Sequence, residues 1–114
     1  MAAAGELVVL VTAPAEEEAA AIGRALVEEG LAACVNLVGP IRSIYRWQAK
    51  VQDERECLLL IKTRAALYAA VEARVRALHS YDVPEIIAVQ IDRGSAPYLD
   101  WVYEATGAVR QHRR

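Results

Sequence analysis

The sequence predicts an α+β domain with a ferredoxin-like fold, in which the elements follow the order β-α-β-β-α-β and a further helix ends the chain. Three observations support this prediction. Four apolar segments have the composition of strands, two helical patterns separate them as right-handed crossovers require, and 114 residues suffice for one hydrophobic core. We therefore expect residues 1–114 to form a single domain without repeats or linkers.

The first strand and the first helix follow each other directly. The segment GELVVLVTA is a near-continuous apolar strand that ends at Thr12. A proline and the acidic residues 16–18 come next, and both are favoured in the first turn of a helix. Gly30 is the expected end of this helix. Its buried stripe is formed by Ile22, Leu26 and the alanines between them.

The second and third strands are expected to form an unusually long hairpin. Residues 33–50 read as strand for most of their length, with a Gly-Pro break at residues 39–40, although a mean strand has only about 5–6 residues. The partner strand runs from about Val51 to Thr63 and contains the apolar block CLLLI. Only a few residues around Ala49 connect the two strands, which favours antiparallel pairing.

The last three elements are a helix, a strand and a closing helix. The apolar positions of the second helix are Leu67, Val71, Val75 and Leu78, at helical spacing. The loop LHSYDVPE leads to the fourth strand, EIIAVQI. Ser95 is the expected N-cap of the last helix, and Gly107 closes it. This helix carries Leu99, Trp101 and Val102.

The predicted strands are apolar on both faces. A sheet with one covered face should alternate apolar and polar residues, but LVVLV, CLLLI and IIAV do not. The C-terminal helix is too small to cover the second face, so we expect self-association through it as a symmetric homo-oligomer. The long hairpin is then an arm that packs Tyr45 and Trp47 onto a neighbouring subunit.

Charge and composition argue against several functional classes. The net charge is −2 with interspersed signs, which is not the footprint of a nucleic-acid-binding protein. The basic tail at about residues 108–114, including Arg110, reads as a solubilising end. No run is long enough to span a membrane, and the N-terminus lacks the features of a secretory signal. Cys34 and Cys57 lie inside predicted strands, which indicates free thiols and a cytoplasmic location.

Five motifs resemble those of the CutA family of divalent-cation tolerance proteins, in the same order and spacing. They are AACVN (residues 32–36), SIYRWQAK (43–50), LLIKT (59–63), LHSYDVPEIIA (78–88) and YLDW (98–101). The resemblance covers about Leu7 to Trp101. It implies a ferredoxin-like homotrimer whose hairpin arms join the subunits. It also implies a role in tolerance to divalent metals, copper above all, with divalent-metal binding by some members and no established enzymatic reaction.

The best candidate metal ligands are His79, Asp82 and Glu85, in the loop before the fourth strand. Imidazole suits copper or zinc, and carboxylates suit harder ions. No Cys-x-x-Cys or His-x-x-x-His pair is present, and Val11 stands where some CutA proteins have a cysteine proposed as a copper ligand. The alternative is structural: His79 ends a helix, where a cation is favourable, and Tyr81 and Glu85 make hydrogen bonds at the subunit seam.

A second set of residues lies mainly on the hairpin. It is expected to line a cleft between subunits that holds a small anion or metabolite, or else to anchor the arm through aromatic contacts and ion pairs. These cleft or interface residues are Tyr45, Trp47, Lys50, Glu56, Lys62, Tyr81 and Trp101. At the tip, Ala49 stands where relatives often have glycine, so the turn either avoids positive φ or tolerates a small strain.

Catalysis has little support in the sequence, so we expect a protein that is not an enzyme. The serines lack a nucleophile-elbow context, and no glycine-rich phosphate loop follows a strand. Two functions stay open. One is a metal-responsive trimer that binds copper(II) or another divalent cation weakly. The other is a trimeric scaffold or small-molecule sensor with clefts between subunits, similar to PII proteins by fold analogy, with an unknown protein partner.

Overall fold

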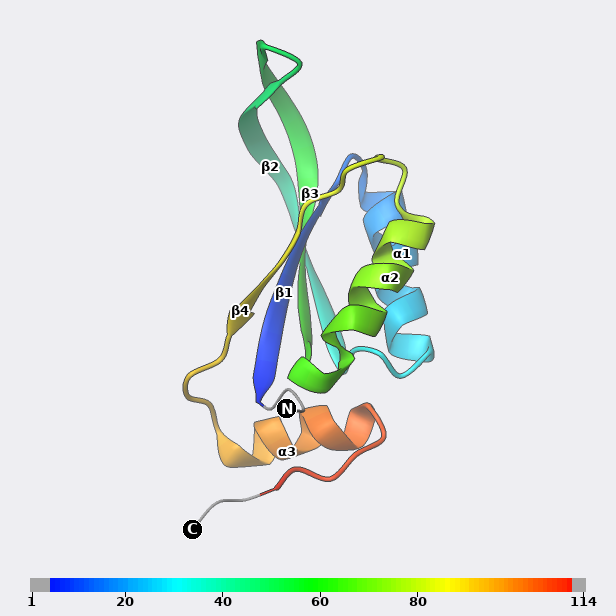
Figure 1. The fold of residues 1–114 in the computed structure, drawn as a ribbon, viewed down its shortest axis with the longest axis vertical. Helices are drawn as coiled ribbons and strands as arrows, with labels where there is room; N and C mark the ends of the chain where they lie inside the picture. Colours follow the sequence, from blue (N-terminus) through cyan, green and yellow to red (C-terminus); the bar gives the residue numbers. More distant parts are fainter. Residues whose placement is uncertain (1–4, 112–114) are drawn as a thin grey trace.

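The computed structural model describes residues 5–111. A four-stranded sheet carries two helices on one face, and a hairpin extends beyond it (Figure 1). The elements are β1 (Glu6–Ala13), α1 (Glu16–Glu28), β2 (Cys34–Trp47), β3 (Lys50–Arg64), a 3-10 turn (Ala65–Leu67), α2 (Tyr68–Leu78), β4 (Ile86–Gln90) and α3 (Ala96–Ala105). No helix within the described range is long and apolar enough to cross a membrane.

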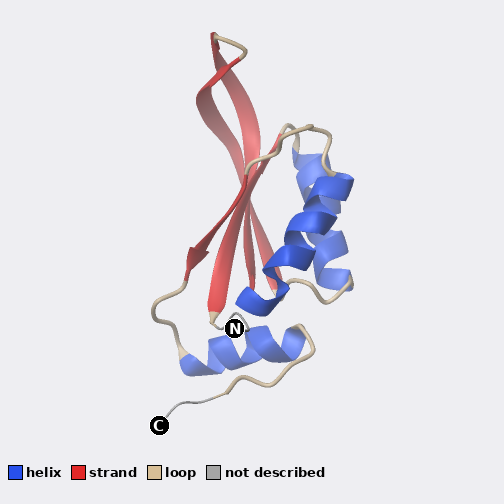
Figure 2. Cartoon of the chain, viewed as in Figure 1, coloured by secondary structure: helices blue, strands red, loops and turns tan. Residues whose placement is uncertain are grey.

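The sheet has the strand order β2-β3-β1-β4, and all three neighbouring pairs are antiparallel. This confirms the predicted ferredoxin-like fold and the hairpin between the second and third strands. Figure 2 shows α1 and α2 together on one side of the sheet and α3 beside its lower end. β1 runs one residue further than predicted, to Ala13, and β4 is shorter than the predicted EIIAVQI segment.

The core lies between the sheet and the pair α1 and α2. The fully buried residues of the strands include Val9, Val11, Leu59 and Ile61, and those of the helices include Leu26, Val71 and Val75. Burial of such side chains from water is the main stabilising term of a small domain. Leu78 was predicted to belong to the buried apolar stripe of α2. It is 37% exposed instead, because it is the last residue of that helix.

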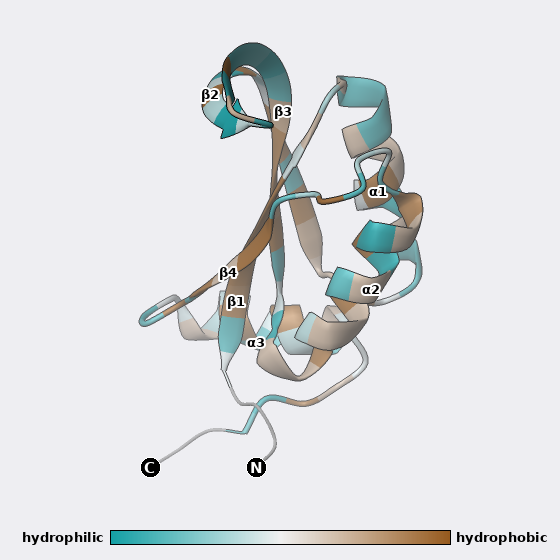
Figure 3. Cartoon of the chain, turned by 45° about the horizontal axis from the view of Figure 1, so that its top comes forward, coloured by the Kyte–Doolittle hydropathy of each residue, from teal (hydrophilic) through white to brown (hydrophobic). Residues whose placement is uncertain are grey.

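The opposite face of the sheet is also apolar, as predicted. Because side chains alternate along a strand, Val8 and Leu10 point away from the helices that cover Val9 and Val11. Their partners on β4 are Val89 and Ile87, which are 55% and 51% exposed. Hydrophobic residues follow β1 and β4 in Figure 3. α3 leaves this outer face largely uncovered within one chain (Figure 1).

The arm is the distal part of the β2–β3 hairpin, residues 41–56. The two strands pair from Cys34 opposite Lys62 to Trp47 opposite Lys50, with a register shift between Val38 and Ile41 at the predicted break. The two turn residues, Gln48 and Ala49, have φ of 52° and 66°. A two-residue hairpin turn of this hand requires positive φ at both positions. Ala49 therefore adopts the left-handed conformation that glycine reaches without strain.

At two of the predicted helix ends, the backbone has the expected positive φ. Gly30 and Gly107 have φ of 71° and 82°, as residues that follow a helix often do. Ser95 occupies the N-cap position of α3 but makes no side-chain capping hydrogen bond. The positions of these helix ends are therefore confirmed, and the chemistry of the serine cap is not.

Arg110 corrects the interpretation of the C-terminal tail. Its guanidinium donates to Glu6 at 2.9 Å and to Asp100 at 3.2 Å, and the side chain is only 23% exposed. It ties the end of the chain to β1 and α3 and is no solvated solubilising group. The remaining basic positions of the predicted tail, residues 112–114, lie outside the described residues.

Candidate functional site

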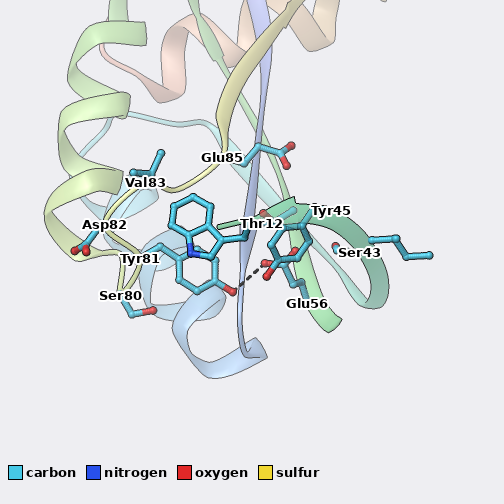
Figure 4. A pocket seen from close by; sticks show the side chains of 11 residues that line it. Thr12, Ser43, Tyr45, Glu56, Ser80, Tyr81, Asp82, Val83 and Glu85 are labelled. Carbon is cyan, nitrogen blue, oxygen red and sulfur yellow. Dashed lines mark hydrogen bonds between the residues drawn. The ribbon is translucent and has the colours of Figure 1, made fainter. Parts of the chain in front are cut away.

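A cavity of about 670 Å³ lies between the arm and the loop that connects α2 to β4 (Figure 4). We call it the arm cavity. Its walls include three aromatic residues and three acidic ones, and none of its described lining residues is basic. These six are Tyr45, Trp47, Tyr81, Glu56, Asp82 and Glu85. The cavity therefore gathers four of the seven predicted interface residues and two of the three predicted metal ligands.

Tyr81 and Glu56 form the central contact of the arm cavity. The Tyr81 hydroxyl donates to Glu56 Oε2 at 3.0 Å (Figure 4). Burial, reinforced by the hydrogen bond to Glu56, raises the pKa of Tyr81 well above its usual range. The phenol therefore stays protonated at neutral pH and keeps donating to the carboxylate.

Glu56 is an unusual carboxylate because it is buried without a cation. The residue as a whole is only 8% exposed. Within residues 5–111, the one hydrogen bond of its side chain comes from Tyr81, and no arginine, lysine or histidine pairs with the carboxylate. A buried charge normally has an opposite charge or several hydrogen bonds to offset its desolvation. Glu56 has one neutral donor.

A second phenol–carboxylate pair lies on the same face of the arm. Tyr45 donates to Glu54, two residues before Glu56 on β3. This hydrogen bond, assisted by burial and by the negative charge of both glutamates, raises the pKa of Tyr45 to about 12. Glu54 was missed in the sequence analysis. The period of two along β3 could have found it, because alternate residues of a strand share a face.

His79 is a structural residue in this fold. Its side chain is fully buried, Nε2 lies 2.7 Å from the Thr12 carbonyl oxygen, and Nδ1 accepts the Tyr81 backbone N–H at 3.0 Å. Because Nδ1 accepts, Nε2 carries the proton and donates to the carbonyl. The Glu18 carboxylate lies 3.4 Å from Nδ1 and accepts from both the amide and the hydroxyl of Ser80. Neither ring nitrogen is available to a metal ion.

The predicted ligand set His79, Asp82 and Glu85 does not assemble within one chain. Asp82 and Glu85 line the arm cavity, while the imidazole is directed into the core. Over residues 5–111, no group of three or more histidine, cysteine, aspartate or glutamate side chains could hold a metal ion. Val11 is fully buried in the core. Within residues 5–111 of one chain, the three predicted ligands therefore do not converge on one point.

The other predicted interface residues are not among those that line the arm cavity. Lys50 pairs with Trp47 at the tip of the arm. Lys62 contacts the Asn36 side chain near the opposite end of the hairpin. Trp101 is on α3, with its ring 5.6 Å from that of Tyr98, and is largely exposed. The structure thus separates the seven predicted residues into one cavity and three other surface sites.

Comparison with known proteins gives a consistent family. A family model described as CutA1 divalent ion tolerance protein matches residues 7–105. The divalent-cation tolerance protein CutA of Thermus thermophilus is 54% identical over 102 residues, which are 90% of this chain and 99% of that protein. The chloroplastic protein CutA of Arabidopsis thaliana is 47% identical over 100 residues, which are 88% of this chain and 55% of that protein. This chain therefore spans about half the length of the plant relative.

The fold comparison agrees with the sequence comparison. The solved structure of the Thermus thermophilus divalent cation tolerance protein superimposes with a TM-score of 0.87 at 54% identity, over 90% of this chain and 99% of that one. The range matched by the family model, residues 7–105, includes every described residue that lines the arm cavity. The chain belongs to the CutA1 divalent ion tolerance protein family.

Proposed function

We propose that the protein acts in tolerance to divalent metal ions as a homotrimer, assembled through the outer face of its sheet and through its arms. The observation that carries this proposal is the uncovered apolar face formed by Val8, Leu10, Ile87 and Val89. A large exposed apolar patch on a soluble domain marks an interaction surface. The family name supports the role in metal tolerance.

The arm supports assembly independently. Trp47 is 48% exposed near its tip, and Ile44 and Val51, on the other side of the ribbon, are each 65% exposed. Burial of one large apolar side chain contributes about 1.5–3 kcal/mol, so an isolated subunit would leave much stabilising surface in water. A second and third copy of the chain provide matching surfaces, and symmetric closure leaves no open end.

The experiment is sedimentation equilibrium of the tag-free chain and of Ile87→Lys. We expect a trimer for the unchanged chain and dissociation for Ile87→Lys, because a lysine at this position would bury an unpaired charge. Arg93→Glu, a charge change on the loop after β4, is the control and should stay trimeric. A monomer for the unchanged chain, or a trimer for Ile87→Lys, would contradict assembly through the outer face.

The sequence-based proposal also has His79, Asp82 and Glu85 bind copper(II) or another divalent cation. The geometry gives this part little support, because both ring nitrogens of His79 are already hydrogen-bonded. We therefore infer that the role in metal tolerance does not depend on an imidazole ligand in this loop. Calorimetry with copper(II) and zinc should find no tight site that His79→Ala removes. If calorimetry instead found one bound ion per subunit, and a folded His79→Ala variant lost it, direct metal binding through His79 would be supported.

The remaining sequence-based predictions fit this proposal. We place the protein in the cytoplasm, where its two free cysteines, Cys34 and Cys57, would stay reduced. We assign it no enzymatic reaction. The family is named for tolerance and not for a reaction.

A second candidate function is a small-molecule sensor, and the arm cavity favours it. Its volume of about 670 Å³ lies within the range of roughly 300–1,000 Å³ typical of small-molecule sites. A thermal-shift screen with small metabolites tests this function. A dose-dependent rise in melting temperature supports it, and no shift with any compound argues against it.

A further inference from the structure

We propose that the arm cavity binds a small organic cation, in which an amine or guanidinium group is carried on an apolar body. This inference deepens the sensor function proposed above and rests on it. It differs from the sequence-based expectation of a small anion or metabolite at these residues. It also differs from metal binding, since the ligand is held by aromatic faces and one buried carboxylate.

The first argument is the buried charge of Glu56. One oxygen, Oε2, accepts from Tyr81, and the other accepts no hydrogen bond from the described residues. Yet no fully buried side-chain oxygen or nitrogen within the described range lacks a hydrogen-bond partner. Oε1 is therefore not fully buried, and Glu56 is one of the residues that line the arm cavity. A positively charged donor placed there would pair with a carboxylate that has already lost most of its hydration.

The second argument is the aromatic lining. Tyr45, Trp47 and Tyr81 contribute to the walls, and the two phenol hydroxyls already donate to Glu54 and Glu56. With their hydroxyls occupied, the tyrosines present mainly their rings to a ligand. Aromatic faces attract ammonium and guanidinium groups, tryptophan most strongly, so the same walls that accommodate an apolar body also favour a positive charge.

The third argument is the sign of the local charge. Asp82 and Glu85 add two carboxylates at the edge of the cavity, and none of its described lining residues is basic. This arrangement repels phosphate and carboxylate ligands. A bare metal ion is also a poor match, because the described residues of the cavity do not supply the ligands that it needs. It needs several oxygen, nitrogen or sulfur ligands that converge at about 2.0–2.6 Å, and no such group occurs in residues 5–111.

The test uses benzylammonium as the probe, with benzyl alcohol and benzoate as neutral and anionic molecules of the same shape. Calorimetry on the tag-free full chain should show saturable binding of benzylammonium, with affinity about tenfold or more above that of either control. Glu56→Gln keeps the side-chain size and an acceptor for Tyr81. It should weaken binding about tenfold or more, because it removes the charge. Asp92→Asn, a change at a 94% exposed side chain outside the cavity, should bind as the unchanged chain does.

Three outcomes would overturn the proposal, and they are distinguishable. Equal affinity for benzyl alcohol, or full affinity in Glu56→Gln, leaves a small-molecule site but removes the cation preference. No binding of any probe at millimolar concentration, with no hit in the thermal-shift screen, removes the sensor function as well. No binding together with dissociation of the Glu56→Gln trimer means that a cation of a neighbouring subunit occupies the cavity. Circular dichroism of each variant confirms that it is folded.

Discussion

Single hydrogen-bonding side chains position the loop between α2 and β4. His79 donates to the Thr12 carbonyl and accepts from the Tyr81 amide, so one buried ring links the end of α2, the end of β1 and the first residues of the loop. The Tyr81 hydroxyl then reaches Glu56 on the arm. The shape of the arm cavity therefore depends on a residue that does not line it.

We predict that His79→Ala lowers the free energy of unfolding by about 3 kcal/mol, because it creates a void and leaves a buried carbonyl and amide without partners. Urea denaturation at a fixed protein concentration measures the change. Leu78→Ala, at the neighbouring and partly exposed position, is the control and should cost about 1 kcal/mol or less. A loss for His79→Ala no larger than that of the control would show that the imidazole does not hold the loop.

Ala49 carries a small conformational strain at the tip of the arm. Its φ of 66° lies in the left-handed region, which costs a residue with a Cβ roughly 1–2 kcal/mol. We predict that Ala49→Gly stabilises the protein by about 0.5–1 kcal/mol, after the greater freedom of glycine in the unfolded chain is subtracted. Ala70→Gly, on the exposed side of α2, should instead destabilise by about 1 kcal/mol. Thermal unfolding of both variants is decisive, and a loss of stability in Ala49→Gly would contradict the turn geometry.

The phenol–carboxylate pairs predict how stability depends on alkaline pH. The hydrogen bond to Glu54 raises the pKa of Tyr45 to about 12, against about 10 in an unfolded chain. Between these values the folded state keeps a proton that the unfolded state has lost, so the free energy of unfolding falls as pH rises. This contribution is intact below about pH 10 and disappears as pH passes through about 12. Tyr45→Phe should make the fall less steep in denaturation curves measured across this range, and an unchanged slope would refute the assignment.

Among the elements, the β2–β3 hairpin extends furthest beyond the rest of the fold (Figure 1). β2 and β3 have 14 and 15 residues, and their distal halves extend beyond the rest of the sheet (Figure 1). The sequence could predict this hairpin, the other strands and the helices α1, α2 and α3, because hydrophobic periodicity, proline, glycine and the short connection act locally. It did not predict the 3-10 turn at Ala65–Leu67. It could also predict that the strands are apolar on both faces, since the absence of alternation is visible in the residues themselves.

We predict that Trp47→Ala weakens self-association by about 2 kcal/mol or more, as removal of an aromatic anchor often does. Sedimentation over a range of protein concentrations gives the change in dissociation constant. Val109→Ala, at an exposed apolar position after α3, is the matched control. A Trp47→Ala protein that dissociates no more readily than this control would show that the arm does not anchor a neighbour.

At the scale of the whole molecule, contacts between residues far apart in the sequence decide the local chemistry. His79, Asp82 and Glu85 are neighbours in the sequence, but the backbone at the end of α2 directs the imidazole toward Thr12, 67 residues away. Arg110 looked like part of a solvated tail because Glu6, its partner, is 104 residues earlier. The pairing of Glu56 with Tyr81 likewise depends on how the arm and the loop pack, which no local pattern encodes.

Native mass spectrometry of the tag-free protein, before and after addition of copper(II) and zinc, tests the central claim most directly. We predict a trimer whose mass does not change at micromolar metal. The reasons are the proposed assembly through the outer face and the absence, in the described residues, of a group of three or more ligand side chains. A monomer would contradict assembly through the sheet and the arms. A trimer that gains three metal ions, which the His79→Ala variant no longer binds, would contradict the inference that metal tolerance does not depend on an imidazole ligand in the loop between α2 and β4.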